Sequence, residues 1–339
     1  MKTIALKLII SCLIYSSAMI SGFSQEVEVL KIWDKAPHNA FTDLIRFRSS
    51  FYCAFREAPG HVPREEADNG RIRILRSEDG IVWESAALLS SGKYDLRDPK
   101  LSVAPGKKLM VTMGGSYYVN GKIIGLMPHV AFSDDGKKFT DPFPAIVDEE
   151  IRTPNDWIWR VTWNDGMGYG VVYQSRTEGN KTKVRLLQTV DGIAYSQLSD
   201  LALDSLPNES TIRFDKDDNM LILIRREGGA FGLLGESVFP YTDWKWTNLG
   251  YRLGGPNFLV LKNSLLCMAT RLYSPGGNKT VVNVTARNGK ILKQIELPSG
   301  NDTSYPGMLI YRKMLWITYY SGHEGKTSVY LAKIRLKDL

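Results

Sequence analysis

Apolar and polar residues follow a pattern along this chain that repeats six times. Each repeat starts with a short strand-like segment, crosses a polar turn, and continues into a more apolar segment that ends in a polar or small residue. Short runs of this kind, bounded by turn residues, are typical of antiparallel strands. The six pairs of segments are 41–47 with 51–56, 100–103 with 108–114, 157–163 with 168–176, 210–214 with 220–226, 257–261 with 265–271, and 307–311 with 314–320.

Helical periodicity is almost absent from the sequence. Each repeat spans roughly 50 residues, which suits the four strands of one propeller blade. We therefore predict an all-β fold, a six-bladed β-propeller of four-stranded antiparallel blades. Because blades share a continuous ring of packing, residues 25–339 are expected to form a single domain.

Three stretches in the first half of the chain share a second pattern. They read SEDGIVW at 77–83, SDDGKKF at 133–139 and TVDGIAY at 189–195, and their starts lie 56 residues apart. The Asp and hydroxyl side chains can bond nearby backbone N–H groups while the Gly adopts a positive φ, so each stretch predicts a tight turn. The pattern resembles the Asp box, or BNR repeat, of the sialidase superfamily, a turn on the rim of a propeller blade. The resemblance implies architecture and not activity, because these turns lie away from the chemistry in that family.

The N-terminal segment predicts export. Lys2 and Lys7 precede an apolar run at 8–20, and small residues come just before Gln25. This is the layout of a secretory signal peptide, here residues 1–24, and the run is too short to span a bilayer. We expect a periplasmic or extracellular protein with no membrane insertion after the signal is removed.

The net charge narrows the choice of partners. Removal of the signal would lower the formal net charge from +7 to +5, and the basic residues form no dense run. An anionic glycan is therefore the expected partner, and nucleic acid is not.

Cys53 and Cys267 lie in apolar strands of blades that are not neighbours, so two buried free thiols are expected. The histidines and cysteines lack zinc-site spacing, and we predict no metal or cofactor and a monomer.

Arginines occur where second strands end. In a propeller these ends converge at one face with the starts of the innermost strands. Arg's planar guanidinium can grip a carboxylate in a bidentate way, so the set predicts a carboxylate-binding site. The arginines are Arg56, Arg225, Arg226 and Arg271.

Glu209 begins the innermost strand of the fourth blade, and Tyr305 begins that of the sixth. This arrangement resembles the sialidase family, in which a Glu and an Arg share a blade and a Tyr from the last blade is the nucleophile. The resemblance implies that Tyr305 is the nucleophile, that Glu209 is its base, and that Arg225 and Arg271 belong to an arginine triad. A base is needed because a phenol has a pKa of about 10. A neutral nucleophile also avoids repulsion from a carboxylate-bearing sugar.

The sequence departs from that family at the first innermost strand. Sialidases usually carry an Arg-Ile-Pro motif there, whereas residues 38–44 contain no arginine. Either Arg56 replaces the missing group or the site holds a sugar other than sialic acid. A general acid is also required, and in the family it is an Asp in the loop that here spans 57–70. We assign it to Asp68, which lies nearest the following strand, and expect His61 of this loop to bind substrate.

Residues 96–100 support a different chemistry. They resemble the Arg-Asp-Pro motif of five-bladed invertase-type glycosidases, in which the Asp stabilises the transition state. Asp98 would take that role and Asp43 would correspond to the nucleophile. We retain both carboxylates as substrate-binding candidates.

The histidines support a third interpretation. His38, His61 and His323 lie on the first and last blades, which are neighbours in a closed ring. Some polysaccharide lyases and unusual rhamnosidases on propellers are similar in using His on uronate-containing glycans. The sequence thus predicts a retaining exo-glycosidase for a terminal acidic sugar. A lyase, a neutral-sugar glycosidase and a non-catalytic glycan-binding propeller remain as alternatives.

Overall fold

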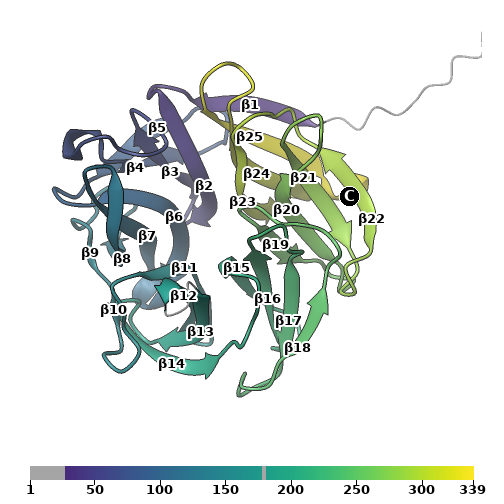
Figure 1. The fold of residues 1–339 in the computed structure, drawn as a ribbon. Helices are drawn as coiled ribbons and strands as arrows, with labels where there is room; N and C mark the ends of the chain where they lie inside the picture. Colours follow the sequence, from purple (N-terminus) through teal and green to yellow (C-terminus); the bar gives the residue numbers. More distant parts are fainter. Residues whose placement is uncertain (1–26, 178–180) are drawn as a thin grey trace, which may run out of the picture.

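The computed structural model describes residues 27–177 and 181–339 of the chain. In these residues the strands form six sheets arranged around a central axis as propeller blades (Figure 1). Five sheets have four antiparallel strands, and the third adds a short strand that pairs in parallel at its edge. The predicted six-bladed β-propeller is confirmed. The predicted signal peptide, residues 1–24, lies outside the described residues.

The strands of each blade follow one another from the axis outward (Figure 1). Blade 1 contains β2 (His38–Phe47), β3 (Ser50–Ala58), β4 (Arg71–Ser77) and β5 (Glu84–Leu89). Blade 2 contains β6 (Asp95–Ala104), β7 (Lys108–Val119), β8 (Lys122–Ser133) and β9 (Phe143–Pro144). Blade 3 contains β11 (Asp156–Asn164), β12 (Met167–Thr177), β13 (Lys181–Thr189), β14 (Ala194–Asp200) and the added β10 (Ile146–Val147).

The second half of the ring has the same arrangement. Blade 4 contains β15 (Pro207–Phe214), β16 (Met220–Arg226), β17 (Leu233–Ser237) and β18 (Lys245–Asn248). Blade 5 contains β19 (Asn257–Val260), β20 (Leu266–Leu272), β21 (Lys279–Thr285) and β22 (Ile291–Glu296). Blade 6 contains β23 (Thr303–Tyr311), β24 (Met314–Ser321), β25 (Ser328–Arg335) and β1 (Glu28–Trp33). Short 3₁₀ helices are η1 (Glu66–Asp68), η2 (Pro105–Lys107) and η4 (Leu336–Asp338).

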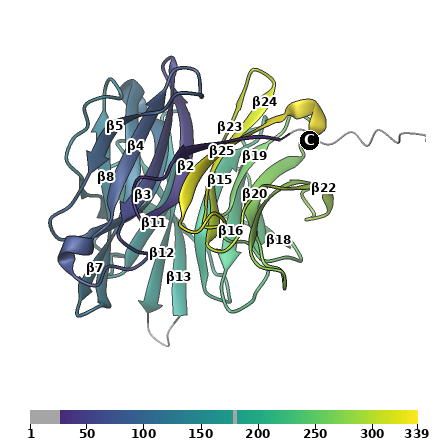
Figure 2. The same ribbon diagram turned by 90° about the horizontal axis from the view of Figure 1, so that it is seen from above.

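The first strand of the chain closes the ring. β1 pairs antiparallel with β25, so the outermost strand of blade 6 comes from the N-terminal side of blade 1 (Figures 1 and 2). This pairing covers an edge of β25 that would otherwise be exposed. The repeat pattern of the sequence does not predict this strand, because 28–33 precedes the first repeat.

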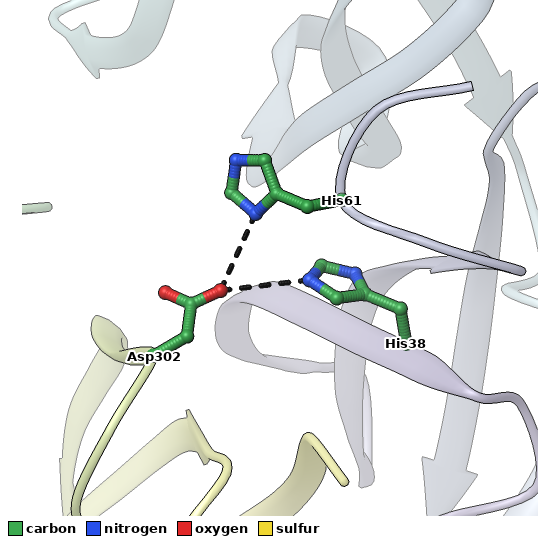
Figure 3. Close-up of side chains that lie close together, drawn as sticks. All are labelled: His38, His61 and Asp302. Atoms are coloured by element: carbon green, nitrogen blue, oxygen red, sulfur yellow. Dashed lines mark hydrogen bonds and ion pairs between the residues drawn. The ribbon is translucent and has the colours of Figure 1, made fainter. Parts of the chain in front are cut away.

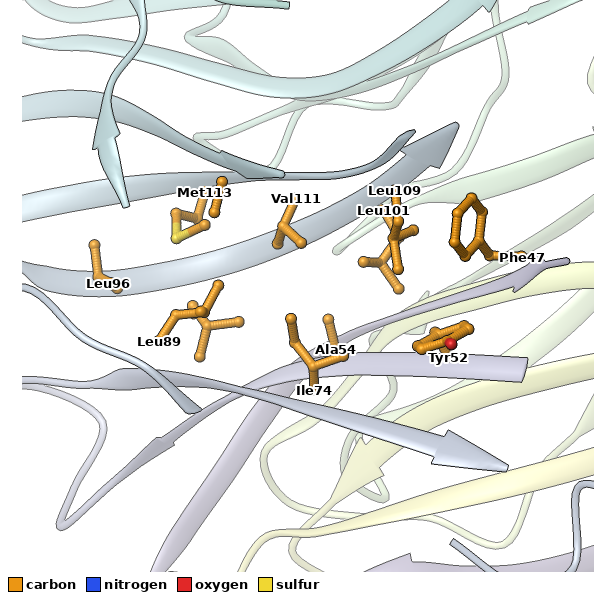
Figure 4. Packing of buried hydrophobic residues seen from close by; sticks show 12 residues of the cluster. Phe47, Tyr52, Ala54, Ile74, Leu89, Leu96, Leu101, Leu109, Val111 and Met113 are labelled. Carbon is orange, nitrogen blue, oxygen red and sulfur yellow. The ribbon is translucent and has the colours of Figure 1, made fainter. Parts of the chain in front are cut away.

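The middle strands explain the apolar runs in the sequence. All nine residues of β3 are buried, and most residues of β16 and β24 are buried as well. Such strands pack against a neighbouring blade on each face, so they have no solvent-facing side. Six hydrophobic clusters of eight or more buried residues in the described part of the chain each span two neighbouring blades. In Figure 4, for example, Tyr52 and Ile74 of blade 1 face Leu101 and Val111 of blade 2.

Cys53 and Cys267 are buried free thiols, as predicted. Burial raises the pKa of both thiols, to about 12 for Cys267, so neither is a reactive thiolate. Among the described residues, none of the helices has the length and apolarity needed to cross a membrane.

The three predicted turns have one hydrogen-bonding scheme. In the first, the N–H of Gly80 donates to Oγ of Ser77 at 2.8 Å, and Oδ1 of Asp79 accepts the next two N–H groups at 2.8 and 3.0 Å. The turns at Asp135 and Asp191 repeat these bonds. Ser77 pairs with Phe51 at the beginning of β3, so the turn lies at the propeller face opposite the end of β3.

The glycine of each turn packs on the preceding blade. A Cβ atom on Gly80 would lie 2.1 Å from the ring of Trp316 in blade 6. The equivalent atoms on Gly136 and Gly192 would meet Tyr52 of blade 1 and Met110 of blade 2. The repeated turns therefore act as contacts between blades.

This packing predicts the effect of Gly80→Ala. The variant should lose about 1–3 kcal/mol more unfolding free energy than Gly106→Ala, because forced overpacking costs that much. Gly106 is a matched control, since both glycines have φ 73° but nothing lies within 4 Å of the Cβ position of Gly106. Chemical denaturation measures both, and equal losses would contradict the assigned contact.

Candidate functional site

Five of the six innermost strands contain a β-bulge at the same level of the propeller. In each, two consecutive residues of the innermost strand oppose one residue of the next strand. A bulge re-aims the side chains beside it, and bulges are common next to active sites. The bulged pairs are Phe41-Thr42, Asp98-Pro99, Trp159-Arg160, Asn208-Glu209 and Tyr305-Pro306.

The bulges carry backbone strain. Phe41, Asp98 and Tyr305 have φ values of 65°, 49° and 53°. Such conformations cost of order 1–3 kcal/mol each in non-glycine residues and cluster at functional sites. Blade 5 pairs without a bulge, but its innermost strand follows Gly255. The N–H of Gly255 donates to Oε2 of Glu209 at 2.8 Å, and a Cβ there would lie 2.5 Å from the ring of Tyr305.

Tyr305 and Glu209 are joined by a direct hydrogen bond. The Tyr305 hydroxyl donates to Oε1 of Glu209 at 2.5 Å, and Nη1 of Arg225 donates to the same oxygen at 2.7 Å. Burial opposes ionisation of Glu209, but the Arg225 charge and these hydrogen bonds keep its pKa below the ordinary 4.5. Burial and the charge of Glu209 raise the pKa of Tyr305 well above 10. The pair is thus a neutral phenol beside an ionised carboxylate.

Aromatic rings and a second guanidinium surround Tyr305. Its ring centroid lies 5.0 Å from that of Phe41 and 5.9 Å from those of Trp159 and Tyr320. The guanidinium carbon of Arg271 lies 5.7 Å from the same ring. These contacts fix the orientation of the phenol, whose side chain is only partly exposed.

Asp98 has a carboxylate oxygen without a hydrogen-bond partner. Its residue exposure is 8%, and its Oδ1 accepts no hydrogen bond within the described residues. Burial raises the pKa of Asp98, although Lys100 and Arg97 oppose this. Lys100 is also buried, which lowers its pKa to about 8. An unsatisfied buried oxygen costs free energy, so Asp98 is suited to accept a ligand hydroxyl.

Two of the three histidines named in the sequence analysis contact the carboxylate of Asp302, which the sequence analysis did not single out. Asp302, just before β23, contacts His38 of β2 and His61 of the loop between β3 and β4 (Figure 3). His323 does not join them, because its Nδ1 pairs with Oγ of Ser321 at 2.9 Å.

Arg56 has a structural role in place of the predicted substrate contact. Its side chain is fully buried, and Nη2 pairs with Oδ1 of Asp95 at 2.6 Å. Its Nη1 donates to the carbonyl of Gly60 at 2.8 Å. Arg56 therefore cannot reach a sugar, but it anchors the loop that carries His61.

Asp43 is also used within the fold. Its two oxygens accept from the guanidinium of Arg160 at 2.8 and 2.9 Å, and the N–H of Leu101 donates to it at 2.7 Å. Its residue exposure is zero. This burial and pairing argue against the predicted substrate contact and against the invertase-type nucleophile.

Asp68 lies in η1, away from the proposed nucleophile. Its Oδ2 accepts from the backbone N–H of Arg64 at 3.3 Å, and it forms no ion pair with the central residues. Its loop reaches Asp302 through His61. The structure therefore does not support Asp68 as the general acid.

The sequence analysis misses several residues of the site. Phe41 and Trp159 lie at the bulges of β2 and β11, at the level of Tyr305 in β23, and both fall within predicted first strands, so an alignment of those strands contains a signal for them. Tyr320 and Asp302 lie in an apolar run and in a loop, and no sequence pattern marks them.

Solved structures of other proteins share this fold. A protein of unknown function from Dyadobacter fermentans is 18% identical with a TM-score of 0.79, over 91% of this chain and 99% of that one. The fold is a sialidase-like propeller. A Trypanosoma rangeli sialidase holding 2,3-difluorosialic acid as a covalent intermediate is 10% identical with a TM-score of 0.66. That match covers 92% of this chain and 59% of the sialidase.

A third neighbour is a variant α-L-arabinofuranosidase of Fusarium graminearum in complex with an iminosugar inhibitor. It is 14% identical with a TM-score of 0.67, over 92% of this chain and 98% of that one. No protein-family model and no curated protein matches the sequence. At these identities the likeness establishes the fold alone.

The burial of Asp43 predicts a stability defect. Asp43→Ala leaves Arg160 charged and buried, so the free energy of unfolding should fall by about 3–5 kcal/mol. The exposed Asp134, which lies 3.8 Å from Lys108, provides a control whose alanine variant should change stability by less than about 0.5 kcal/mol. Denaturant titration measures both. A stable Asp43→Ala protein that lost only turnover would instead support a catalytic role.

Proposed function

We propose that the protein is a retaining exo-glycoside hydrolase that removes a terminal carboxylate-bearing sugar from a glycan. The Tyr305 oxygen attacks the anomeric carbon and Glu209 takes the phenolic proton. Water then hydrolyses the tyrosyl glycoside. The observation that carries this proposal is the 2.5 Å hydrogen bond from Tyr305 to the ionised Glu209. We further propose that residues 1–24 direct the enzyme out of the cytoplasm.

The charges around Tyr305 support an acidic substrate. Arg225 lies 3.1 Å from the Tyr305 hydroxyl, and Arg271 lies over its ring. An anionic nucleophile would repel a substrate carboxylate, whereas a neutral phenol does not. Glu227, paired with Arg225 at 2.6 Å, is partly exposed, so a substrate carboxylate could take its place.

Other features support a sugar ligand. Asp98 offers an unpaired oxygen to a hydroxyl. Trp159 and Phe41 are buried beside Tyr305 and hold its partly exposed ring in place. The sialidase and arabinofuranosidase structures show sugar-directed ligands on related propellers.

The test is incubation of residues 25–339 with sialylated and with uronate-containing glycans, followed by chromatography and ultraviolet absorbance. A released saturated acidic sugar supports the proposal. An unsaturated uronate would overturn it in favour of a lyase. Binding without any released sugar would overturn it in favour of a glycan-binding propeller.

Tyr305→Phe tests the nucleophile. We expect kcat to fall by at least about 10³-fold, because the attacking oxygen is lost. Binding should remain, since the ring and its neighbours persist. Tyr319→Phe is the matched control, because its hydroxyl is also buried and donates to the carbonyl of Pro298 at 2.8 Å. Turnover measures kcat and calorimetry measures binding; normal turnover by Tyr305→Phe would contradict the assignment.

The ionised state of Glu209 predicts that activity falls at low pH. Only its ionised form can accept the Tyr305 proton, so kcat/KM should fall as the pH drops through the pKa of Glu209. Because that pKa is held below 4.5, the fall should occur below pH 4.5. A pH–rate profile measures this limb. A limb that begins well above pH 4.5 would show that another group supplies the base.

A further inference from the structure

Arg252 lies in the segment that joins β18 of blade 4 to β19 of blade 5, at the face of the propeller that carries Tyr305. Within the described residues its side chain pairs with no carboxylate. It lies instead over the ring of Tyr273, with the guanidinium carbon 4.0 Å from the ring centroid, and the residue is partly exposed. The arginines near the ends of second strands each have a carboxylate partner, namely Arg56, Arg225, Arg226 and Arg271. The charge of Arg252 is therefore available to a ligand.

A series of contacts between guanidinium groups and aromatic rings connects Arg252 to the nucleophile. The guanidinium carbon of Arg271 lies 5.8 Å from the ring centroid of Tyr273 and 5.7 Å from that of Tyr305. A cation at such a distance from a ring is attracted by the electrons of the ring face. Arg252 and Arg271 thus contact one tyrosine, and Arg271 also contacts the nucleophile.

The backbone also places Arg252 close to Tyr305. Gly255 follows Arg252 by three residues, which span at most about 11 Å of extended chain. A Cβ atom on Gly255 would lie 2.5 Å from the ring of Tyr305, and one on Gly254 would lie 2.5 Å from the hydroxyl of Tyr273. Consecutive glycines therefore contact the two tyrosines, and this short segment fixes Arg252 beside the site.

Phe231 provides exposed apolar surface next to Arg252. It lies in the loop after β16, and its residue exposure is 45%. The N–H of Gly232 donates to the carbonyl of Tyr251 at 2.8 Å, so Phe231 and Arg252 each adjoin a residue of this bonded pair. The Phe231 carbonyl accepts from Nε of Arg226 at 2.8 Å, which holds the loop in place. An exposed ring and an unpaired cation thus lie on two adjoining segments.

The charges of these segments favour an anionic ligand. The carboxylates of Glu209 and Glu227 both pair with Arg225, at 2.7 and 2.6 Å, and do not neutralise Arg252. A planar guanidinium binds a carboxylate well, and an aromatic ring contributes strongly to an interface. A neutral sugar would leave the charge of Arg252 without a partner.

We propose that Arg252, Tyr273 and Phe231 form a second subsite, which binds a carboxylate-bearing sugar next to the terminal one, an inference that rests on the proposed function. The terminal sugar lies at Tyr305, with its carboxylate at Arg225 and Arg271. The following sugar places its own carboxylate at Arg252. The substrate is then a glycan with consecutive acidic sugars.

The test compares a glycan that ends in two consecutive sialic acids with sialyllactose, which has one. If uronates are the substrates, a glycan ending in two uronates and one ending in a single uronate take their places. In Arg252→Gln we expect KM for the glycan with two acidic sugars to rise about 10-fold with kcat unchanged, because a charge-assisted hydrogen bond is lost. KM for sialyllactose should rise much less, because that glycan has no second carboxylate.

Arg312→Gln is the matched control. Arg312 also lies over a tyrosine ring, 5.1 Å from the centroid of Tyr311, but it belongs to the turn between β23 and β24 at the opposite face. Neither substrate should change its KM in this variant. Calorimetry with Tyr305→Phe, alone and combined with Arg252→Gln, measures binding of both glycans without turnover.

The outcomes separate this inference from the proposed function. Equal affinity of Tyr305→Phe for the two glycans would overturn the second subsite. Equal losses for both glycans in a folded Arg252→Gln protein would also overturn it. In either case the release of a terminal acidic sugar by the unaltered protein would still support the proposed function. Normal turnover by Tyr305→Phe would instead overturn the nucleophile, which is the proposed function itself.

Discussion

The site depends on one constraint, the two-against-one bulges in five innermost strands. A regular strand would place successive side chains alternately on its two faces, and both faces of a blade are already committed to packing. The bulge adds a residue that belongs to neither face. Phe41, Asp98 and Tyr305 accept positive φ there, and in the blade without a bulge Gly255 also has a positive φ and, lacking a side chain, lets the Tyr305 ring approach. The positions of the reactive groups are therefore set by the sheets and not by flexible loops.

The charged groups around these bulges divide into those that stabilise the fold and those that can take part in chemistry. Asp43 and Arg160 are joined by two hydrogen bonds, as are Arg56 and Asp95, and both pairs are buried. Buried charges need such partners because unpaired ones are costly. The pairs of Glu209 and Asp302 differ, since each of these carboxylates also accepts a hydrogen bond from a group that can lose or gain a proton. A proton can be exchanged only at carboxylates of this second kind, whose partners include a group that can lose or gain a proton.

The sequence is sufficient for the architecture and for part of the site. The six strand pairs, the three turns, and the strand starts that carry Glu209 and Tyr305 all follow from local patterns. Strand β1 could not be predicted, because its partner β25 lies at the other end of the chain. Arg56 could not be distinguished from Arg225 either. Both lie near the end of the second strand of a blade. Arg56 pairs with Asp95 between two blades, whereas Arg225 lies opposite the bulge of β15. The sequence of a single strand does not show which of these positions an arginine takes.

Phe41 lies in the first innermost strand, where residues 38–44 contain no arginine. Its ring makes edge contacts with His61 and Tyr305, with centroids 5.5 and 5.0 Å apart. The guanidinium on this side of the site comes from Arg97 of β6, which lies over the Phe41 ring at 5.2 Å. Arg225 and Arg271 lie beside Tyr305 from blades 4 and 5. Blade 1 therefore contributes an uncharged ring to the site, and the positive charge is supplied by arginines of other blades.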